Sequence, residues 1–397
     1  MHCDLFEWND NSSVISPNLI SKDKINIADQ LALFFEILHA GRTPRINSDG
    51  VISNHASTYG SFQTMSGGSS GFPKVLERTC NSWILSFITN DKLYNLSGSR
   101  GALFGSLGHS LSLYGALEAV FLGCKLHYLA GLSPSSQIQY LDDKKIEILY
   151  ATPTQLRLML SAKYQNSLIN SLRYVFIGGA SIEQNTLIKL SGLAPNAELI
   201  KFYGSSETSF ITISDRLTPV NSVGKAYPGV EIVLGELPDK QVSLGETGRV
   251  WVRSPYLFSK YVGNNSRGLN KFSNWVSPGE LAKLDLDQNL FLLGRIDRLF
   301  KIKDQTIKPE EIERYLLTKK DVVDAAVVKK NDALRGNRAV AYIATSEVVD
   351  IEKLKNECIS LIPPLDGSFQ IVEISLEKFP FLPSGKSDIS KLQHWDI

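Results

Sequence analysis

The chain has 397 residues, a formal net charge of +1 and 43% hydrophobic residues. This length and composition are typical of a globular protein with two or more domains. The near-zero net charge excludes a general electrostatic affinity for nucleic acid or for an anionic membrane. No apolar run approaches the roughly 18 residues that a membrane-spanning helix needs. The four cysteines form no CxxC pair, and acidic residues stand where a signal peptide would be basic. We therefore expect a cytoplasmic protein with free thiols, and neither a disulfide framework nor a zinc site.

Helical periodicity over residues 26–40 predicts a helix that ends at Gly41, and residues 75–89 also have a helical pattern. From about residue 101 to 207, short apolar segments alternate with amphipathic ones. The predicted strands are 125–129, 146–151, 172–178 and 198–204, and the predicted helices are 112–122, 152–162 and 183–192. This alternation indicates a parallel sheet that helices cover on both faces.

The pattern changes after about residue 220. Segments 230–235, 247–254 and 289–294 have the pattern of antiparallel strands joined by glycine turns. A further unit of about 100 residues has a helix at 308–319, strands at 324–330 and 337–346, a helix at 351–362 and a strand at 369–375. We therefore predict an α/β fold. A large N-terminal domain, residues 1–296, has parallel sheets covered by helices plus a small antiparallel subdomain, and a small mobile α+β domain follows at 297–397.

Residues 64–74 read TMSGGSSGFPK, a stretch rich in glycine and serine that ends in a lysine. Glycines let backbone N–H groups approach a ligand closely, and consecutive N–H groups form an anion-binding nest. Serine hydroxyls and Lys74 add donors and a cation, so the stretch fits a polyphosphate site. The same composition is also typical of a flexible surface loop. The Walker A pattern is excluded here because Pro73 precedes Lys74, and the later "SGKS" lacks its leading glycine.

Five segments resemble, in the same order, motifs of the adenylate-forming superfamily. That superfamily includes acyl- and aryl-CoA synthetases, adenylation domains of peptide synthetases, and luciferases. The segments are 64–74, "LRYVFIGGAS" at 172–181, "FYGSSET" at 202–208, "GRIDRLFKIKDQTIKPEEIE" at 294–313 and "LPSGKSDISKL" at 382–392. The resemblance covers roughly residues 30–397, and it describes a compact member with a shortened N-terminus.

The resemblance implies a role for each motif residue. The β- and γ-phosphates of ATP would lie against Ser66, Gly67, Gly68, Ser69, Ser70, Gly71 and Lys74. The adenine would lie against Gly178, Gly179 and Ala180 and stack on Tyr203, which Gly204 follows. Glu280 and Arg295 would hold the ribose hydroxyls, although Arg295 alone also fits an interdomain salt bridge.

Four residues would be catalytic by the same resemblance. Ser206 would contact the α-phosphate, and Glu207 would bind Mg²⁺, a hard cation that prefers oxygen ligands. Lys386 would bridge the carboxylate and the α-phosphate, and His109 would gate the acyl pocket. Taken alone, Lys386 also fits a solvated loop lysine, and His109 also fits a core histidine.

The activity that the resemblance implies is ATP-dependent activation of a carboxylic acid to an acyl-adenylate, with release of pyrophosphate, followed by transfer to a thiol. Joining two anions needs positive charge and ordered donors more than an acid or a base. The thiol would be coenzyme A, or the phosphopantetheine of a carrier protein, reached after the C-terminal domain rotates about Asp297. Two alternatives stay open: a stand-alone adenylating enzyme that loads an acyl carrier protein, and a degenerate nucleotide-binding homologue without turnover.

The sequence departs from the family pattern in four places. Fewer residues precede the phosphate loop than is usual, and Gly67 replaces a serine. Glu280, within Pro-Gly-Glu, replaces the aspartate of Thr-Gly-Asp. Asp304 replaces a glycine near the pantetheine path. An aspartate can adopt a left-handed conformation at some strain, but it adds bulk and negative charge. The last departure weakens the case for coenzyme A more than the case for adenylation.

Overall fold

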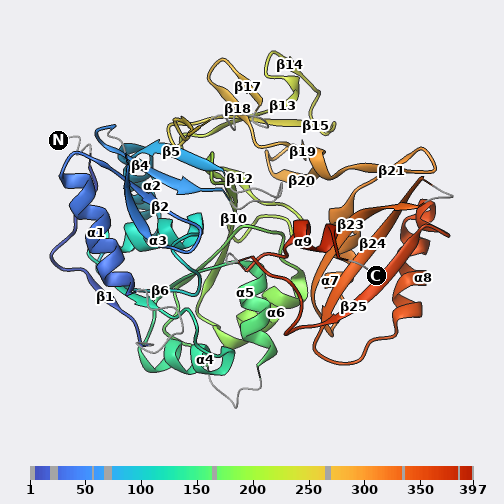
Figure 1. Ribbon diagram of the computed structural model, residues 1–397, viewed down its shortest axis with the longest axis horizontal. Coiled ribbons are helices and arrows are strands. Elements are labelled where there is room, and N and C mark those ends of the chain that lie inside the picture. Colours follow the sequence, from blue (N-terminus) through green and yellow to red (C-terminus); the bar gives the residue numbers. More distant parts are fainter. Residues whose placement is uncertain are drawn as a thin grey trace.

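The computed structural model describes residues 5–17, 26–55, 58–66, 74–162, 168–263, 270–332, 336–382 and 385–395. Figure 1 shows an α/β body that carries an antiparallel sheet, and the last hundred residues form a separate lobe beside helices α5 and α6. Among the described residues, no helix is long and apolar enough to cross a membrane.

The central sheet has the strand order β1-β7-β6-β8-β9-β10-β11-β12. Neighbours from β1 to β10 run parallel, and β11 and β12 are antiparallel to their neighbours. Its strands are β1 (Ser13–Ile15), β6 (Arg100–Leu103), β7 (Lys125–Tyr128), β8 (Ile148–Ala151), β9 (Tyr174–Ile177), β10 (Glu198–Ser205), β11 (Ser209–Ile213) and β12 (Lys225–Ala226). The predicted parallel sheet is thereby confirmed. The sequence pattern did not indicate the parallel strands β1 and β6 or the antiparallel strands β11 and β12.

Helices cover both faces of this sheet, as the alternating pattern predicted. Side chains of β8 alternate between two cores: Ile148 and Tyr150 belong to one cluster, and Leu149 and Ala151 to the other. The first cluster also contains residues of α2 (Cys80–Tyr94) and α3 (Ser110–Phe121). The second contains residues of α4 (Pro134–Asp143), α5 (Pro153–Ser161) and α6 (Gln184–Leu193).

A second sheet has the order β16-β5-β4-β2-β3 and is antiparallel except between β2 and β4. Its strands are β2 (Thr43–Ile46), β3 (Ile52–His55), β4 (Ser61–Met65), β5 (Val75–Thr79) and β16 (Lys260–Tyr261), and α1 (Ile27–His39) packs against it. The prediction of a helix over 75–89 is wrong at its start. Residues 75–79 pair with β4, and α2 begins at Cys80, where the Thr79 hydroxyl accepts from the Ser82 amide.

The third sheet is the predicted antiparallel subdomain. Its strands are β13 (Glu231–Leu237), β14 (Lys240–Gln241), β15 (Gly248–Arg253), β17 (Asn270–Phe272), β18 (Trp275–Ser277), β19 (Glu280–Leu284) and β20 (Leu290–Arg295). Strands β19 and β20 place Glu280 directly opposite Arg295. The chain then leaves β20 through a 3₁₀ turn, Ile296–Arg298.

Residues after this turn build two hydrophobic clusters of their own, which supports the predicted boundary at 296/297. The lobe consists of the hairpin β21 (Phe300–Ile302) and β22 (Gln305–Ile307), α7 (Pro309–Leu317), β23 (Val322–Asp332), β24 (Gly336–Thr345), α8 (Ile351–Leu361), a 3₁₀ turn (Pro363–Leu365), β25 (Phe369–Ser375) and α9 (Ile389–Gln393). Strand β24 is antiparallel to β23 and parallel to β25.

Candidate functional site

The glycine–serine stretch begins with the last two residues of β4, Thr64 and Met65, and ends at Lys74, directly before β5, which is antiparallel to β4. Two hydrogen bonds join Ser66 to Lys74. The Ser66 amide donates to the Lys74 carbonyl at 2.8 Å, and the Lys74 amide donates to Ser66 Oγ at 2.9 Å. Gly67, Gly68, Ser69, Ser70 and Gly71 lie outside the described residues. The Lys74 ammonium lies 5.1 Å from the centre of the Tyr261 ring.

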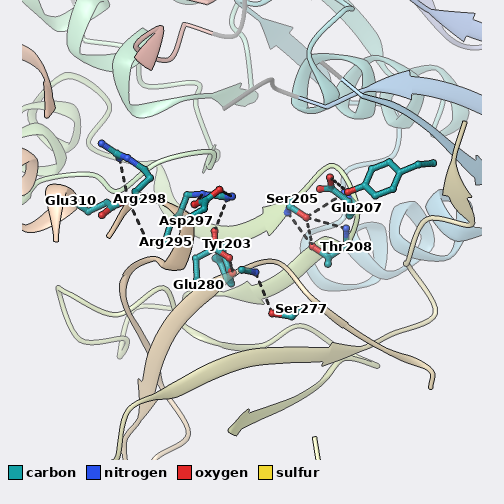
Figure 2. A network of polar contacts seen from close by, with 12 residues as sticks. Tyr203, Ser205, Glu207, Thr208, Ser277, Glu280, Arg295, Asp297, Arg298 and Glu310 are labelled. Atoms are coloured by element: carbon teal, nitrogen blue, oxygen red, sulfur yellow. Dashed lines mark hydrogen bonds and ion pairs between the residues drawn. The ribbon is translucent and has the colours of Figure 1, made fainter. Parts of the chain in front are cut away.

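The turn between β10 and β11 carries Ser206 and Glu207, both partly buried. The Glu207 carboxylate accepts a hydrogen bond of 2.9 Å from the Tyr261 hydroxyl. The Ser205 hydroxyl accepts from the amides of Glu207 and Thr208, at 3.3 Å each, so the turn is held by its own side chains (Figure 2). Ser206 Oγ lies 2.8 Å from Ser110 Oγ at the start of α3.

Figure 2 shows a second polar group at a distance from this turn, around Tyr203. The buried Tyr203 hydroxyl donates to Glu280 Oε2 at 2.7 Å, and Arg295 Nη1 lies 3.4 Å from Glu280 Oε1. Arg295 also donates two hydrogen bonds, of 2.9 and 2.8 Å, to the Asp297 carboxylate. Burial raises the pKa of Glu280 to about 7, against the opposing charge of Arg295. Arg295 therefore forms a salt bridge with Asp297, as the alternative interpretation of this arginine predicted. It also lies beside Glu280, as the proposed role in ribose binding requires.

Gly178 follows β9 at a crowded position: a Cβ there would lie 2.1 Å from the ring of Phe202, so any larger residue would have to displace that ring. Gly179 has φ +97° and is exposed, as is Ala180. Lys386 reaches this loop from the C-terminal lobe: a Cβ on Gly179 would lie 3.1 Å from Lys386 Cε and 3.5 Å from its Nζ. The preceding Gly385 lies against Thr152 and Gln155 at the start of α5.

Burial lowers the pKa of Lys386, and the charge of Arg295 lowers it further, while Glu280 and Glu207 act in the opposite sense. His109, the half-buried N-cap residue of α3, has its pKa lowered to about 3 by burial and by the charge of Lys386. His109 is therefore neutral at pH 7. These influences show that residues from five separate segments share one electrostatic environment.

A buried ion-pair cluster joins the C-terminal lobe to α5. The Arg157 guanidinium donates to both carboxylate oxygens of Glu183 at 3.1 Å, and it donates to the Val323 carbonyl at 2.6 Å. Its Nη2 lies 3.6 Å from Asp324 Oδ1, and the side chains of both residues are less than a tenth exposed. Asp324 also accepts from Thr154 Oγ1 at 3.1 Å. We call Arg157, Glu183 and Asp324 the lobe contact.

The residue Ser387 ties this contact to the candidate site. Its hydroxyl donates to Asp324 Oδ1 at 3.3 Å, and it directly follows Lys386. The lobe contact therefore fixes the backbone that carries Lys386 against the loop at Gly179.

Sequence reasoning missed three residues of the site: Arg78, Ser110 and Tyr261. Tyr261 lies on β16, which pairs with β5, and so reaches both Lys74 and Glu207. Ser110 directly follows His109, a residue that was identified. Arg78 is fully buried behind the turn of Glu207. The sequence pattern predicted a helix at this position, and a single arginine within such a pattern does not reveal which residues it contacts.

The turn and the start of α3 carry oxygen atoms of the type that suits Mg²⁺, and the Ser206 and Ser110 hydroxyls lie 2.8 Å apart. The Glu207 carboxylate and the hydroxyls of Ser206 and Ser110 are hard oxygen donors, the type that Mg²⁺ prefers, and Mg²⁺ often binds through one or two carboxylates. Within the described ranges, no group of three or more His, Cys, Asp or Glu side chains could by itself hold a metal ion. The donor set at Glu207 fits an ion that is shared with substrate phosphates.

Comparison with known proteins gives the family. The model of the AMP-binding enzyme family matches residues 62–262. An uncharacterised acyl-CoA ligase, YhfT, from Bacillus subtilis (strain 168) is 29% identical over 335 residues, which are 83% of this chain and 67% of that protein. A putative long chain fatty acid-CoA ligase, VraA, from Staphylococcus epidermidis is 28% identical over 329 residues, 82% of this chain and 66% of that protein. The chain spans about two thirds of the length of these relatives.

Solved structures agree in fold. The amide bond synthetase McbA from Marinactinospora thermotolerans superposes with a TM-score of 0.71 at 21% identity, over 86% of this chain and 70% of that one. The O-succinylbenzoate coenzyme A synthetase MenE from Bacillus subtilis, in complex with AMP, gives 0.70 at 21% identity, over 84% and 69%. The chain belongs to the AMP-binding enzyme family. The predicted superfamily and α/β fold class are confirmed, as is the acid–thiol ligase class at the level of the family.

Proposed function

We propose that this AMP-binding enzyme joins a carboxylic acid to ATP and then transfers the acyl group to a thiol, with coenzyme A as the first candidate. In the first step a carboxylate oxygen attacks the α-phosphorus, and the bond to the β-phosphate oxygen breaks and releases pyrophosphate. In the second step a thiol attacks the acyl carbon, loses its proton and releases AMP.

The observation that carries the proposal is the position of Lys386. This lysine lies against Gly179 in the proposed adenine loop, and its pKa responds to Arg295, Glu280 and Glu207. A cation at this point stabilises the negative charge that grows between the carboxylate and the α-phosphate. The approach of two anions is the main electrostatic barrier of the first step, so this charge would act where it is needed.

The remaining residues would bind and orient. Ser66, Lys74 and the intervening residues would hold the terminal phosphates, and Ser206 would donate to the α-phosphate. Tyr203 and the loop at Gly178 would enclose the adenine. The hydrogen bond from Tyr203 to Glu280 fixes that carboxylate beside Arg295, so the ribose hydroxyls would meet an acceptor and a donor together.

Two further roles follow from charge. Glu207 would hold Mg²⁺, which supplies charge neutralisation to the phosphates when bound. The Tyr261 hydroxyl would orient that carboxylate. His109 is neutral at pH 7, so it would line the acyl pocket without adding a charge.

Two observations support coenzyme A as the acyl acceptor: the β21–β22 hairpin after the hinge, and the names of the relatives, which are CoA ligases. Asp304 has φ +61° in the two-residue turn between β21 and β22, so it occupies the left-handed conformation expected from its departure from glycine. A glycine adopts this conformation without strain, so the aspartate keeps the hairpin turn and adds its side chain there. Transfer of the acyl group to the phosphopantetheine of a carrier protein is the alternative.

The three described cysteines are buried and form no disulfide, which supports a cytoplasmic location.

The test is carboxylate-dependent exchange of labelled pyrophosphate into ATP over a panel of aliphatic and aromatic acids. We expect one class of acid to support exchange, and Lys386→Ala to lower the exchange rate by about 100-fold or more, the size typical of removing a donor to developing charge. ATP affinity, measured by calorimetry, should change much less. Lys391→Ala, at an exposed position of α9, is the matched control and should exchange normally.

Three outcomes would contradict the proposal. Equal losses of exchange and ATP affinity in Lys386→Ala would refute the role of that lysine. ATP binding without exchange for any acid would favour the degenerate homologue. Acyl transfer to a phosphopantetheine-loaded carrier protein, with none to coenzyme A, would replace the proposed acceptor and leave the first step intact.

A further inference from the structure

Arg78 is a fully buried arginine that enters no ion pair within the described part of the chain. It lies on β5, four residues after Lys74, and its guanidinium stands 5.2 Å from the ring centre of Trp83. Burying such a cation is costly unless its donors are satisfied. Its partners therefore indicate what the residue is for.

The guanidinium joins the turn of Ser206 and Glu207 to two other segments. Nη2 donates to the Ser206 and Glu207 carbonyls at 3.1 and 3.3 Å, and Nη1 donates to Ser209 Oγ at 2.8 Å. Nη1 also lies 3.3 Å from the Tyr256 carbonyl, in the segment that leads to Tyr261. One side chain thus fixes the backbone of the turn that carries Ser206 and Glu207 and the segment that leads to Tyr261.

We propose that Arg78 is a positioning residue for the Mg²⁺- and α-phosphate-binding turn, acting on Ser206 and Glu207 through their main chain. This inference rests on the proposed function, because the metal role of Glu207 belongs to it. The carbonyls of Ser206 and Glu207 face Arg78, and the side chain of Glu207 extends to Tyr261 instead. A shift of the turn would therefore move the carboxylate and the Ser206 hydroxyl together.

Ser209 makes the turn depend on this anchor. The residue has φ +56°, a left-handed conformation that is strained for any residue except glycine. Its hydroxyl accepts from Arg78 and from Trp83 Nε1 at 3.0 Å, and it donates to the Tyr256 carbonyl at 3.2 Å. These hydrogen bonds hold the strained residue at the end of the turn. A lysine at position 78 would keep the charge but lose the planar fork that serves several acceptors at once.

The experiment uses two matched serine-to-alanine variants, each of which removes one acceptor of Arg78. Ser209→Ala removes the acceptor on the turn, and Ser82→Ala removes the one on α2, which lies 3.3 Å from Nη1. Trp83→Phe is a third variant that removes the indole donor to Ser209 and keeps the ring beneath Arg78. Arg78→Lys follows as the direct variant, and the serine pair keeps the inference testable if that variant does not fold.

Two readouts separate positioning from general stability. The first is the Mg²⁺ concentration for half-maximal pyrophosphate exchange, set against the KM for the acid. Ser209→Ala should raise the former by about tenfold, the weight of one hydrogen bond to a charged group, and leave the latter within about twofold. Ser82→Ala should leave both near the wild-type values. Trp83→Phe removes one of the hydrogen bonds to Ser209, so it should raise the Mg²⁺ concentration by less than Ser209→Ala does and leave the KM for the acid near the wild-type value.

The second readout needs no activity. Hydrogen exchange at the amides of residues 205–209 should speed up by about tenfold in Ser209→Ala and stay unchanged in Ser82→Ala. Equal exchange rates in both variants, or equal changes in Mg²⁺ dependence, would overturn the inference. A wild-type protein that exchanges no pyrophosphate would refute the proposed function instead, and amide exchange would still decide whether Arg78 holds the turn.

Discussion

Removing the Asp324 carboxylate is expected to loosen the C-terminal lobe from α5. Asp324→Ala deletes the hydrogen bond from Thr154, the ion pair with Arg157 and the link to Ser387. Removal of one partner from a buried ion pair costs roughly 3–5 kcal/mol. Glu183 still pairs with Arg157 at 3.1 Å, so we take the lower end, about 3 kcal/mol. This corresponds to a loss on the order of 100-fold in the equilibrium for docking the lobe.

The assay combines denaturant unfolding with pyrophosphate exchange, since Lys386 depends on the docked lobe. A double-mutant cycle with Arg157→Ala should give a coupling energy above about 1 kcal/mol, as expected for residues in one buried network. The control is Lys319→Ala, which breaks a more exposed ion pair with Glu357 inside the lobe. That variant should cost about 1 kcal/mol or less. An Asp324→Ala protein as stable and as active as the Lys319→Ala control would refute the reasoning.

Three further predictions test separate features. Gly178→Ala places a Cβ 2.1 Å from the Phe202 ring and should destabilise the protein by about 1–3 kcal/mol in urea unfolding. The control Gly192→Ala, where a Cβ meets open space on α6, should stabilise the protein by roughly 0.5–1 kcal/mol. Equal effects of the two substitutions would contradict the packing argument. Burial raises the pKa of Glu118 from 4.5 to about 7, so the folded state binds this proton more tightly than the unfolded state does. The free energy of unfolding should therefore fall as pH rises from about 4.5 to 7, by on the order of 3 kcal/mol more in the wild-type protein than in Glu118→Gln. Identical pH profiles of the two proteins would exclude Glu118 as the cause of this loss. Asp304→Gly should relieve about 1 kcal/mol of left-handed strain and leave pyrophosphate exchange unchanged; a slower exchange would show that Asp304 acts in the first step.

The sequence predicted the parallel part of the fold well because strands and helices alternate there with different periods. The prediction of secondary structure failed where a strand is followed by a helix with no turn between them. Val75–Thr79 is a strand that runs directly into α2, so the combined pattern read as one helix. The three-residue β1 is too short to show a period. Strand β6 reads Arg-Gly-Ala-Leu, which lacks the apolar run that marked the equally short β8 and β9. The boundary at 296/297 stays a prediction that the separate hydrophobic clusters support.

The motif residues of the site were predicted from resemblance, and their roles stay proposals. The structure adds their supports, which no local pattern reveals. Arg78 reaches Ser206 across 128 positions of sequence, and Tyr261 reaches Glu207 across 54. Such partners depend on strand register and on the packing of distant segments. A single sequence therefore identifies the glycine-rich turns and motif cations better than the side chains that hold them in place.

One isotope measurement tests most directly whether an acyl-adenylate forms. The acid is supplied with ¹⁸O in its carboxylate, together with ATP and coenzyme A, and the released AMP is examined by mass spectrometry. Attack of a carboxylate oxygen on the α-phosphorus leaves that oxygen in AMP when the thiol takes the acyl group. We expect one ¹⁸O in each AMP, and label found in inorganic phosphate, with none in AMP, would contradict the account.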